Sequence, residues 1–297
     1  MRLKPAFAAN GRVLAVPREG IVCLYDLPSF REIESIPLLG TNNSVVAYSP
    51  GDAYLVSGGA DARVRVYSSF ERCVLTELPG HQEEIMLFAF PTNGGKMLSV
   101  DFAGKAIWWD LPIWRSNRSY SLPDVWSSAA LSPDGRLLVA GHRAGLVRWW
   151  DAATGRLLAS RQAHRGHVQG VAFSPDGNLL ASVGDDGTLA LWDALSREMT
   201  ADFKLAGFGL GVAFSPDGER LVTGAAGAEA IKLWDLSTRR ELLVLSGQRS
   251  GFLFVGFSPD NDWLAACNHS GQLHVWHADP FPHPRRANSA FGESANP

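Results

Sequence analysis

The sequence predicts an all-β fold assembled from seven similar sheets, and three observations carry this prediction. A pattern of about 42 residues repeats along the chain, glycine and tryptophan are abundant (30 and 10 of 297 residues), and short apolar runs alternate with turn-forming residues. Turns rich in glycine and runs rich in aromatic or β-branched residues are typical of strands. With 46% hydrophobic and 19% charged residues, the chain also differs from a disordered protein.

The repeat is clearest at its end, where an aromatic residue, here called the closing aromatic, precedes Asp, Ser or His. Successive pairs lie 42, 42, 41, 42, 42 and 42 residues apart. The seven pairs are Tyr25-Asp26, Tyr67-Ser68, Trp109-Asp110, Trp150-Asp151, Trp192-Asp193, Trp234-Asp235 and Trp276-His277. So regular a spacing indicates a repeat architecture.

Each repeat contains a turn signal flanked by short apolar runs. Ser-Pro-Asp-Gly stands at 132–135, 174–177 and 215–218, with weaker versions in the other repeats. Proline fixes φ near −65° and glycine tolerates positive φ, so this tetrapeptide reverses the chain between strands. In the fifth repeat the predicted strands cover 170–173, 179–183, 188–192 and 199–203.

Four short antiparallel strands form a small sheet that is apolar on both faces and cannot bury both faces alone. Stacking the sheets around an axis covers each face with a neighbour. The sequence therefore predicts a seven-bladed β-propeller of four-stranded antiparallel blades. The pairs Trp108-Trp109 and Trp149-Trp150 fit, because adjacent strand residues point to opposite faces. The alternative, an exposed aromatic patch, is left open.

Over residues 3–277 the chain resembles the WD-repeat β-propeller family. The resemblance rests on the Trp-Asp endings, the Ser-Pro-Asp-Gly turns and starts similar to Gly-His. In the family this His stands nine residues before the aromatic that ends the first strand. Three repeats keep that distance, namely Gly80-His81 with Phe90, Ala163-His164 with Phe173, and Gly247-Gln248 with Phe257. Gly166-His167 is out of register.

The resemblance implies a structural tetrad of His, Ser, Asp and Trp within a repeat. By register, the fifth repeat has the only complete set, His164, Ser182, Asp186 and Trp192. The third repeat has His81, Ser99 and Trp109 but Ala103 where the family has Asp, and the second has Ser57 and Asp61 but ends in Tyr67. We therefore expect most blades to rely on apolar packing.

We expect residues 1–278 to form the WD-repeat propeller and residues 279–297 a Pro-rich flexible tail. In the family, the beginning of the chain donates the outer strand of the last blade. Only six residues precede Phe7, which aligns with Phe173. We therefore expect the last blade to lack its outer strand or to form it poorly. A further hypothesis is that the chain is the carboxyl-terminal part of a longer ancestor.

Composition and motifs give little support to other functions. The net charge of −3 gives no reason to expect nucleic acid or a membrane as partner, and no apolar run is long enough to span a bilayer. Cys23, Cys73 and Cys267 form no CxxC pair, so a reduced, cytoplasmic protein is expected. We expect no cofactor and no metal, because the histidine pairs His164/His167 and His274/His277 lack further ligands. The His, Ser and Asp of the fifth repeat are interpreted as structural rather than as a hydrolase triad.

The remaining prediction is a rigid disc that binds a protein or peptide partner with loops around the mouth of its central channel. In the family, the position before the turn Asp and the position three residues after Gly-His lie on that face. The side chains placed there are Arg18, Phe102, Arg143, His167, Phe208 and His269. Aromatic residues and arginine often dominate binding energy. The alternative for these side chains is that they are ordinary loop residues, with Phe102 and Phe208 packed down. For the protein as a whole, one alternative is a separated sensor or regulatory module of a larger signalling protein, such as a kinase or a nucleotide-hydrolysing protein. A propeller enzyme is less favoured.

Overall fold

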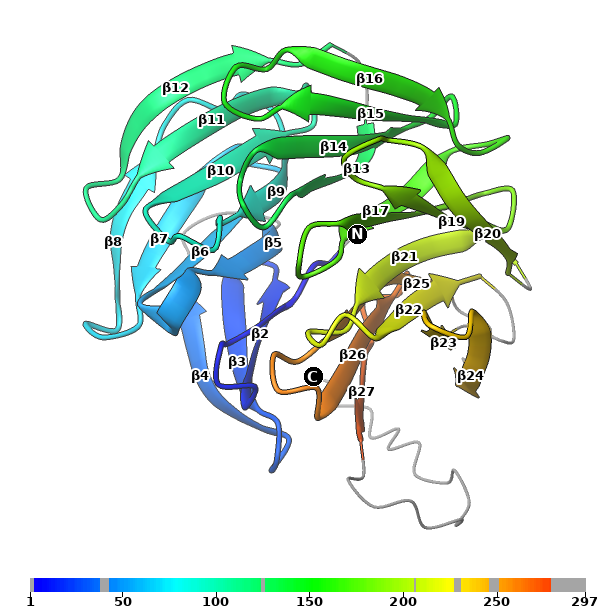
Figure 1. Ribbon diagram of the computed structural model, residues 1–297. Coiled ribbons are helices and arrows are strands. Elements are labelled where there is room, and N and C mark those ends of the chain that lie inside the picture. The colour runs from blue at the N-terminus through cyan, green and yellow to red at the C-terminus, as the bar shows by residue number, and fades with distance from the viewer. Residues whose placement is uncertain are drawn as a thin grey trace.

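Seven small antiparallel sheets stand around a common axis in the computed structural model, which confirms the predicted seven-bladed β-propeller (Figure 1). The structure describes residues 3–37, 43–123, 126–205, 207–226, 231–245 and 251–278. The predicted tail, 279–297, lies outside these residues. Six sheets have four strands and the last has three, as the sequence predicts.

The strands of each blade follow the chain from the axis outward. The innermost strands are β1 (Ala6–Phe7), β5 (Asn43–Tyr48), β9 (Ile85–Ala89), β13 (Trp126–Leu131), β17 (Val168–Phe173), β21 (Gly209–Phe214) and β25 (Phe252–Phe257). The second strands are β2 (Val13–Arg18), β6 (Tyr54–Gly59), β10 (Lys96–Asp101), β14 (Leu137–His142), β18 (Leu179–Gly184), β22 (Arg220–Ala225) and β26 (Trp263–Asn268).

The third strands carry the closing aromatics, and the fourth strands lie at the rim of the disc. The third strands are β3 (Ile21–Asp26), β7 (Val64–Ser68), β11 (Lys105–Asp110), β15 (Leu146–Asp151), β19 (Thr188–Asp193), β23 (Ile231–Asp235) and β27 (Leu273–His277). The fourth strands are β4 (Arg31–Pro37), β8 (Cys73–Leu78), β12 (Arg115–Ser121), β16 (Leu157–Gln162), β20 (Met199–Lys204) and β24 (Arg240–Leu245). A short 3-10 turn, η1 (Pro50–Asp52), follows β5.

The strand directions give the disc two different faces. The loops that enter each innermost strand, together with the turns between second and third strands, make the histidine face, which includes His164 and Asp186. The turns between first and second strands make the Ser-Pro face, which includes Pro133 and Pro175. In the Ser174–Gly177 turn the Gly177 amide donates to the Ser174 carbonyl at 2.9 Å, and Gly177 has φ of 75°. Proline and glycine therefore occupy the turn positions that their backbone preferences suit.

Apolar clusters between neighbouring blades form the core. In the cluster between blades 4 and 5, Trp149 packs edge to face against Trp192 with ring centroids 5.5 Å apart. Both rings are buried, as predicted for aromatic residues on doubly covered strands. Burial of each large aromatic side chain contributes about 2–3 kcal/mol, so the contacts between blades stabilise the ring more than any single sheet could.

Among the described residues, the ring closes without a strand shared between blades 7 and 1. Blade 7 meets blade 1 through an apolar cluster in which Leu14 and Leu27 pack with Trp263. Phe30 also contacts Trp263 edge to face, at 5.6 Å between centroids. The turns of the two blades are close enough that a Cβ atom on Gly11 would lie 2.1 Å from the Asp260 carboxylate. Side-chain packing rather than strand exchange therefore closes the disc.

The first described residues cross the channel from blade 7 to blade 2. Leu3 is buried and lies beside Gly271. Lys4 adds a short parallel bridge to the channel edge of β5, where its amide donates to the Ser44 carbonyl at 2.8 Å and its carbonyl accepts from the Val46 amide at 3.2 Å. The sequence did not predict this crossing.

Replacing Trp263 with Ala tests the seam between blades 7 and 1. Loss of this buried ring should lower the free energy of unfolding by about 3–5 kcal/mol, because it leaves a cavity in the apolar cluster that joins the two blades. Urea denaturation measures this change. Leu195→Ala is the control, since Leu195 is 85% exposed and its loss should change stability by less than about 0.5 kcal/mol. Equal stabilities would contradict closure through this cluster.

Candidate functional site

The four side chains predicted as the tetrad of blade 5 are joined by hydrogen bonds. His164 Nε2 lies 2.9 Å from Ser182 Oγ, and Trp192 Nε1 donates to the same oxygen at 3.0 Å. His164 Nδ1 lies 3.0 Å from Asp186 Oδ1. Because a carboxylate only accepts, Nδ1 carries the proton, and Ser182 donates to the bare Nε2. The network ties the closing aromatic to the loop before β17.

Blade 3 has an equivalent network, so the prediction of a single complete set is wrong. His81 Nε2 lies 2.7 Å from Ser99 Oγ, which also accepts from Trp109 Nε1 at 2.8 Å. The carboxylate comes from Asp101, 2.9 Å from His81 Nδ1, and not from position 103. Asp101 ends β10 at a register shift, where its side chain reaches the histidine directly. An acidic residue 20 positions after the His was the signal in the sequence.

Two more blades use polar contacts at the matching place, so fewer blades than expected rely on apolar packing alone. In blade 6, Trp234 Nε1 donates to Thr223 Oγ1 at 3.1 Å. In blade 2 the turn carboxylate of Asp61 pairs with the buried Arg65 guanidinium at 2.6 Å, and Glu77 pairs with it at 3.1 Å. In blade 2 the turn carboxylate therefore pairs with a guanidinium from the third strand and not with an imidazole.

Burial and hydrogen bonding shift the pKa values of these networks. Burial alone would raise the pKa of Asp186, but hydrogen bonds from Thr188, the Arg165 amide and His164 outweigh it and lower the pKa to about 2. Burial would likewise raise the pKa of Asp101. Hydrogen bonds from His81 and the Lys105 amide outweigh this effect, so the pKa of Asp101 is lowered. Burial lowers the pKa of His164 more than Asp186 raises it, so this histidine is held neutral.

The tetrad geometry does not suit catalysis or metal binding. Ser182 is fully buried and its hydroxyl is already engaged by His164 and Trp192, so no substrate can approach it. Within the described ranges no three His, Cys, Asp or Glu side chains gather closely enough to hold a metal ion.

Three residues of the predicted binding face line one cavity at the channel mouth. The cavity, of about 630 Å³, lies on the histidine face and is lined by Phe102, Arg143 and His167 from blades 3, 4 and 5. Its apolar walls come from Val45, Ile85, Met86 and Trp126. The other lining residues are Lys4, Ser44, Ala60, Glu84 and Ser127. The sequence did not indicate the contributions of the inner strands or of Lys4.

The polar groups of this cavity are held in defined positions. The guanidinium carbon of Arg143 lies 6.0 Å from the centre of the Phe102 ring, within reach of a cation–π contact. Arg143 makes no hydrogen bond or ion pair with another described residue. Glu84 accepts from Ser44 Oγ at 3.0 Å, and His167 Nδ1 lies 3.7 Å from Asp185. Arg143 thus presents unpaired N–H donors beside an aromatic ring and apolar walls.

The other predicted face residues lie outside this cavity. Phe208 is 60% exposed at the entrance to β21, so it is not packed down, while Phe102 is half-buried. Arg18 donates to the hydroxyl of Tyr25 in its own blade, blade 1, at 3.3 Å. His269 is exposed in the loop of blade 7, and its amide donates to the Gly251 carbonyl. The six residues therefore share a face, but only three share a cavity.

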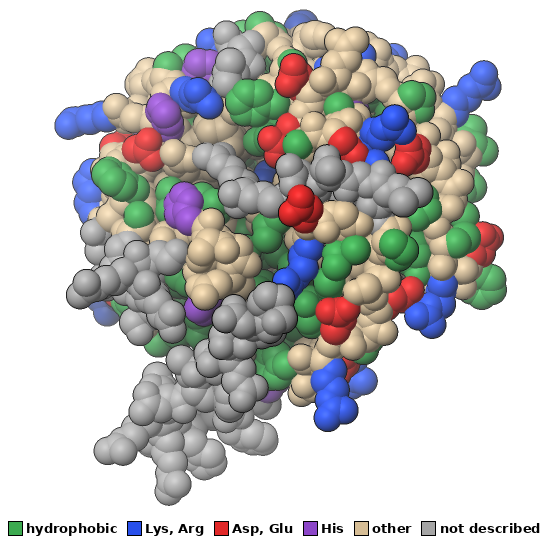
Figure 2. Space-filling model, turned by 180° about the vertical axis from the view of Figure 1, so that it is seen from behind, with side chains coloured by type: hydrophobic (Ala, Val, Ile, Leu, Met, Phe, Trp, Pro, Cys, Tyr) green, Lys and Arg blue, Asp and Glu red, His purple; other side chains and the backbone are tan. Residues whose placement is uncertain are grey.

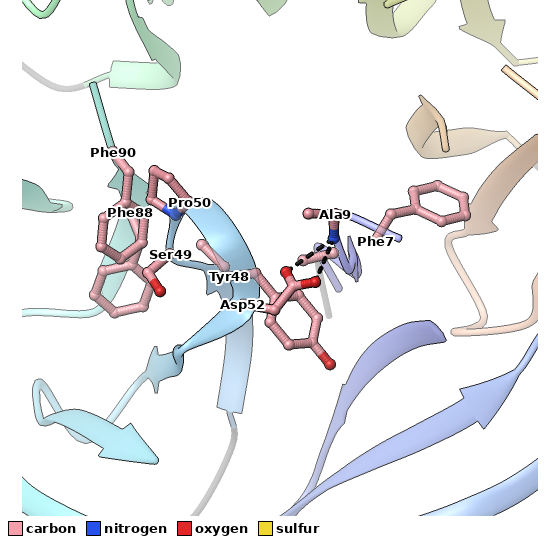
Figure 3. A pocket seen from close by; sticks show the side chains of 10 residues that line it. Phe7, Ala9, Tyr48, Ser49, Pro50, Asp52, Phe88 and Phe90 are labelled. Atoms are coloured by element: carbon pink, nitrogen blue, oxygen red, sulfur yellow. Dashed lines mark hydrogen bonds between the residues drawn. The ribbon is translucent and has the colours of Figure 1, made fainter. Parts of the chain in front are cut away.

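A second hollow of about 380 Å³ opens at the other end of the channel (Figure 3). Phe88 and Phe90 lie beside Pro50, and Phe7 projects on the far side of Asp52. Both oxygens of Asp52 accept from the Ala9 amide at 2.8 Å. This carboxylate is occupied by a contact between blades 1 and 2, so the hollow offers fewer unpaired polar groups than the cavity on the histidine face.

Charged and hydrophobic side chains are mixed on the face of the disc that Figure 2 shows. In the view from behind, the coloured basic, acidic and hydrophobic side chains are interspersed, without a single basic patch (Figure 2). No helix in the part of the chain that the structure covers is long and apolar enough to cross a membrane.

Comparison with protein families agrees with the repeat. The family model "WD domain, G-beta repeat" matches residues 42–68, 117–151, 155–193, 210–235 and 239–277. These five segments cover more than half of the chain.

Curated proteins with detectable similarity are much longer than the segments they share with this chain. Transducin beta-like protein 3 from Bos taurus is 30% identical over 136 residues, which are 41% of this chain and 17% of the relative. Periodic tryptophan protein 2 from Arabidopsis thaliana is 27% identical over 234 residues, 78% of this chain and 21% of the relative. The U3 small nucleolar RNA-associated protein 21 homolog from Schizosaccharomyces pombe is 25% identical over 142 residues, 47% of this chain and 16% of the relative.

Among solved structures, a chain in the crystal structure of the mitotic checkpoint complex superposes with a TM-score of 0.82. The match covers 93% of this chain and 86% of that chain at 19% sequence identity. At this identity the likeness shows the fold alone.

Asp101→Ala tests the network of blade 3. The substitution leaves the His81 imidazole without its acceptor, so the free energy of unfolding should fall by about 1–3 kcal/mol in urea denaturation. Ala103→Asp is the matched control at the position that the sequence suggested. It should give no comparable gain, because Asp101 already occupies the acceptor site, and a stabilisation by Ala103→Asp would contradict the assignment.

Asp186→Asn tests the pKa of the blade 5 carboxyl. A folded-state pKa of about 2, below the ordinary 3.8, means that the carboxylate stabilises the fold above pH 3.8 and loses this effect as the pH falls toward 2. The variant should therefore be less stable than the wild type near pH 7, and the difference should shrink between pH 3.8 and 2. Urea denaturation at a series of pH values measures it. The exposed Asp202→Asn serves as control, and a difference independent of pH would contradict the shift.

Proposed function

Because the chain belongs to the WD domain, G-beta repeat family, we propose that it is a non-catalytic interaction scaffold that binds a protein or peptide on its histidine face. The observation that carries this proposal is the cavity at the channel mouth, where Phe102, Arg143 and His167 come together from three blades. A concave, mostly apolar site with a few polar groups is the usual form of a ligand site.

The chemistry of the cavity supports a peptide that combines an acidic and an apolar group. Arg143 offers N–H donors that match a carboxylate in a bidentate arrangement. Its position beside the Phe102 ring restricts the guanidinium before binding, so less conformational entropy is lost when a partner docks. The apolar walls of Ile85, Met86 and Trp126 would cover a neighbouring hydrophobic side chain.

The alternative function, a regulatory module of a kinase or nucleotide-hydrolysing protein, differs in the identity of the partner and not in the docking surface. The matched relatives extend far beyond the shared segments, and one is named for association with a small nucleolar RNA. We favour a protein partner over RNA because the chain carries 27 basic against 30 acidic residues. Three free cysteines, Cys23, Cys73 and Cys267, support placing the protein in the cytoplasm.

Affinity capture with Phe102→Ala and Arg143→Ala tests the docking surface. Residues that dominate an interface contribute about 2 kcal/mol or more each, so either change should weaken capture of the partner about 30-fold or more. The measurement is quantitative mass spectrometry of proteins that co-purify with the full chain from native lysate, followed by titration of the recovered partner. Phe208→Ala tests whether the surface extends beyond the cavity.

Leu195→Ala is the control, because this exposed side chain lies in a turn on the Ser-Pro face. It should capture the same proteins as the wild type. Capture unchanged by Phe102→Ala and Arg143→Ala, with both variants folded by circular dichroism, would reject the histidine face as the docking surface.

A further inference from the structure

The outer edge of blade 7 has no strand paired with it among the described residues. β27 pairs with β26 alone, whereas the third strand of every other blade pairs on both sides. The Asn268 amide donates to the Gln272 carbonyl at 3.0 Å, and the Ala278 amide donates to the Asp262 carbonyl at 2.6 Å. Hydrogen-bonded pairs alternate along an antiparallel ladder, so the N–H and C=O groups of Leu273, Val275 and His277 point to the open edge.

The closing aromatics beside this edge are more exposed than those of the other blades. Five closing aromatics are nearly inaccessible, with 1–7% of their surface exposed, and these are Tyr67, Trp109, Trp150, Trp192 and Trp234. Only Tyr25 and Trp276 are half-buried. Trp276 lies in blade 7 itself, and Tyr25 lies in the cluster where blade 1 faces blade 7. A fourth strand on β27 would stand between these two rings.

We propose that the open edge of β27 is a second docking site, which takes an extended strand of a partner protein in antiparallel orientation. Strand addition supplies affinity through main-chain hydrogen bonds and specificity through alternate side chains. An exposed edge with unpaired N–H and C=O groups favours such pairing. This inference is independent of the docking surface on the histidine face.

The six complete blades give the register and side-chain preference of the incoming strand. In each, the pairing of third and fourth strands shifts at the closing aromatic, so we expect a bulge opposite Trp276. The residue 11 positions after the closing aromatic pairs with the residue three positions before it. These residues are Ile36, Leu78, Tyr120, Arg161, Phe203 and Leu245. Five of the six are large and hydrophobic or aromatic, so the partner strand needs such a residue opposite Leu273.

The sequence that follows β27 does not supply this residue. At the same distances after Trp276, positions 282–287 read Pro-His-Pro-Arg-Arg-Ala, and they lie outside the described residues. Ala287 stands where the large side chain is required. In blade 6 the corresponding residue is Leu245. A strand from a partner therefore fits the vacant position better than this segment.

Hydrogen–deuterium exchange with a strand peptide tests the proposal on the full chain. The probe is a synthetic peptide with the sequence of β24, Arg-Glu-Leu-Leu-Val-Leu, because β24 is a fourth strand with a large apolar side chain, Leu245, at the required position. At a concentration ten times its dissociation constant it should slow exchange of the Leu273, Val275 and His277 amides about tenfold. The even-numbered amides of β27, which already face β26, should change little.

Methylation of the peptide backbone provides matched controls. In blade 5 the Leu205 amide donates to the Gly187 carbonyl at 2.8 Å, which sets the alternation on the fourth strand. By the same register, N-methyl groups at the positions of Leu243 and Leu245 remove donors that face β27 and should abolish protection. An N-methyl group at the position of Val244 faces away and should leave protection intact.

Several outcomes would overturn the proposal. One is absence of protection, or equal protection by the differently methylated peptides. Another is protection of the three amides in the full chain without peptide. If this protection does not depend on protein concentration, the chain's own residues cover the edge. If it rises with protein concentration, a second copy covers the edge. Faster exchange within β24 would show that the peptide replaces β24 in blade 6 instead of adding to blade 7.

Discussion

The structure depends on one constraint, which is that each blade has two apolar faces and can bury them only against its neighbours. Trp149 and Trp192, on the third strands of adjacent blades, meet in one cluster, and the closing aromatics of blades 2 to 6 are nearly inaccessible to solvent. A disc with this constraint must close. At the seam between blades 7 and 1, side chains such as Trp263 bury the two facing blades against each other.

Polar networks occupy the same region of several blades and supply hydrogen-bond or ion-pair partners to buried polar side chains in different ways. A buried donor or acceptor without a partner is costly, so each network must be complete to stabilise the fold. Blades 3 and 5 pair an imidazole with a carboxylate, and blade 2 encloses Arg65 between Asp61 and Glu77. In blade 6 a single threonine accepts from the indole of Trp234. In blades 3 and 5 these bonds connect the closing aromatic to the loop at the histidine face.

Periodicity was sufficient to predict the fold and the number of blades, because spacing reports directly on repeated strands and turns. The three described strands of the last blade were predicted instead from the few residues that precede Phe7. Periodicity was not sufficient for Asp101, since a carboxylate at a strand end and one in the following turn can reach the same imidazole. It also missed Lys4, whose place in the channel depends on the path of the chain and not on any repeat. Of the six residues predicted at the channel mouth, Phe102, Arg143 and His167 line the cavity. Arg18 does not, because its guanidinium turns toward Tyr25.

Both proposed docking surfaces lie where the sevenfold regularity is broken. At the channel mouth, residues 3 and 4 cross to β5 and fill part of a space that a regular ring would leave open, which leaves an asymmetric cavity beside blades 2 to 5. At the rim, the absence of a fourth strand from the described part of blade 7 exposes backbone groups that the other blades pair internally. Identical blades would present the same surface seven times and could not select one partner orientation. The irregular positions therefore provide the specificity, while the regular ones provide the rigid frame that holds them.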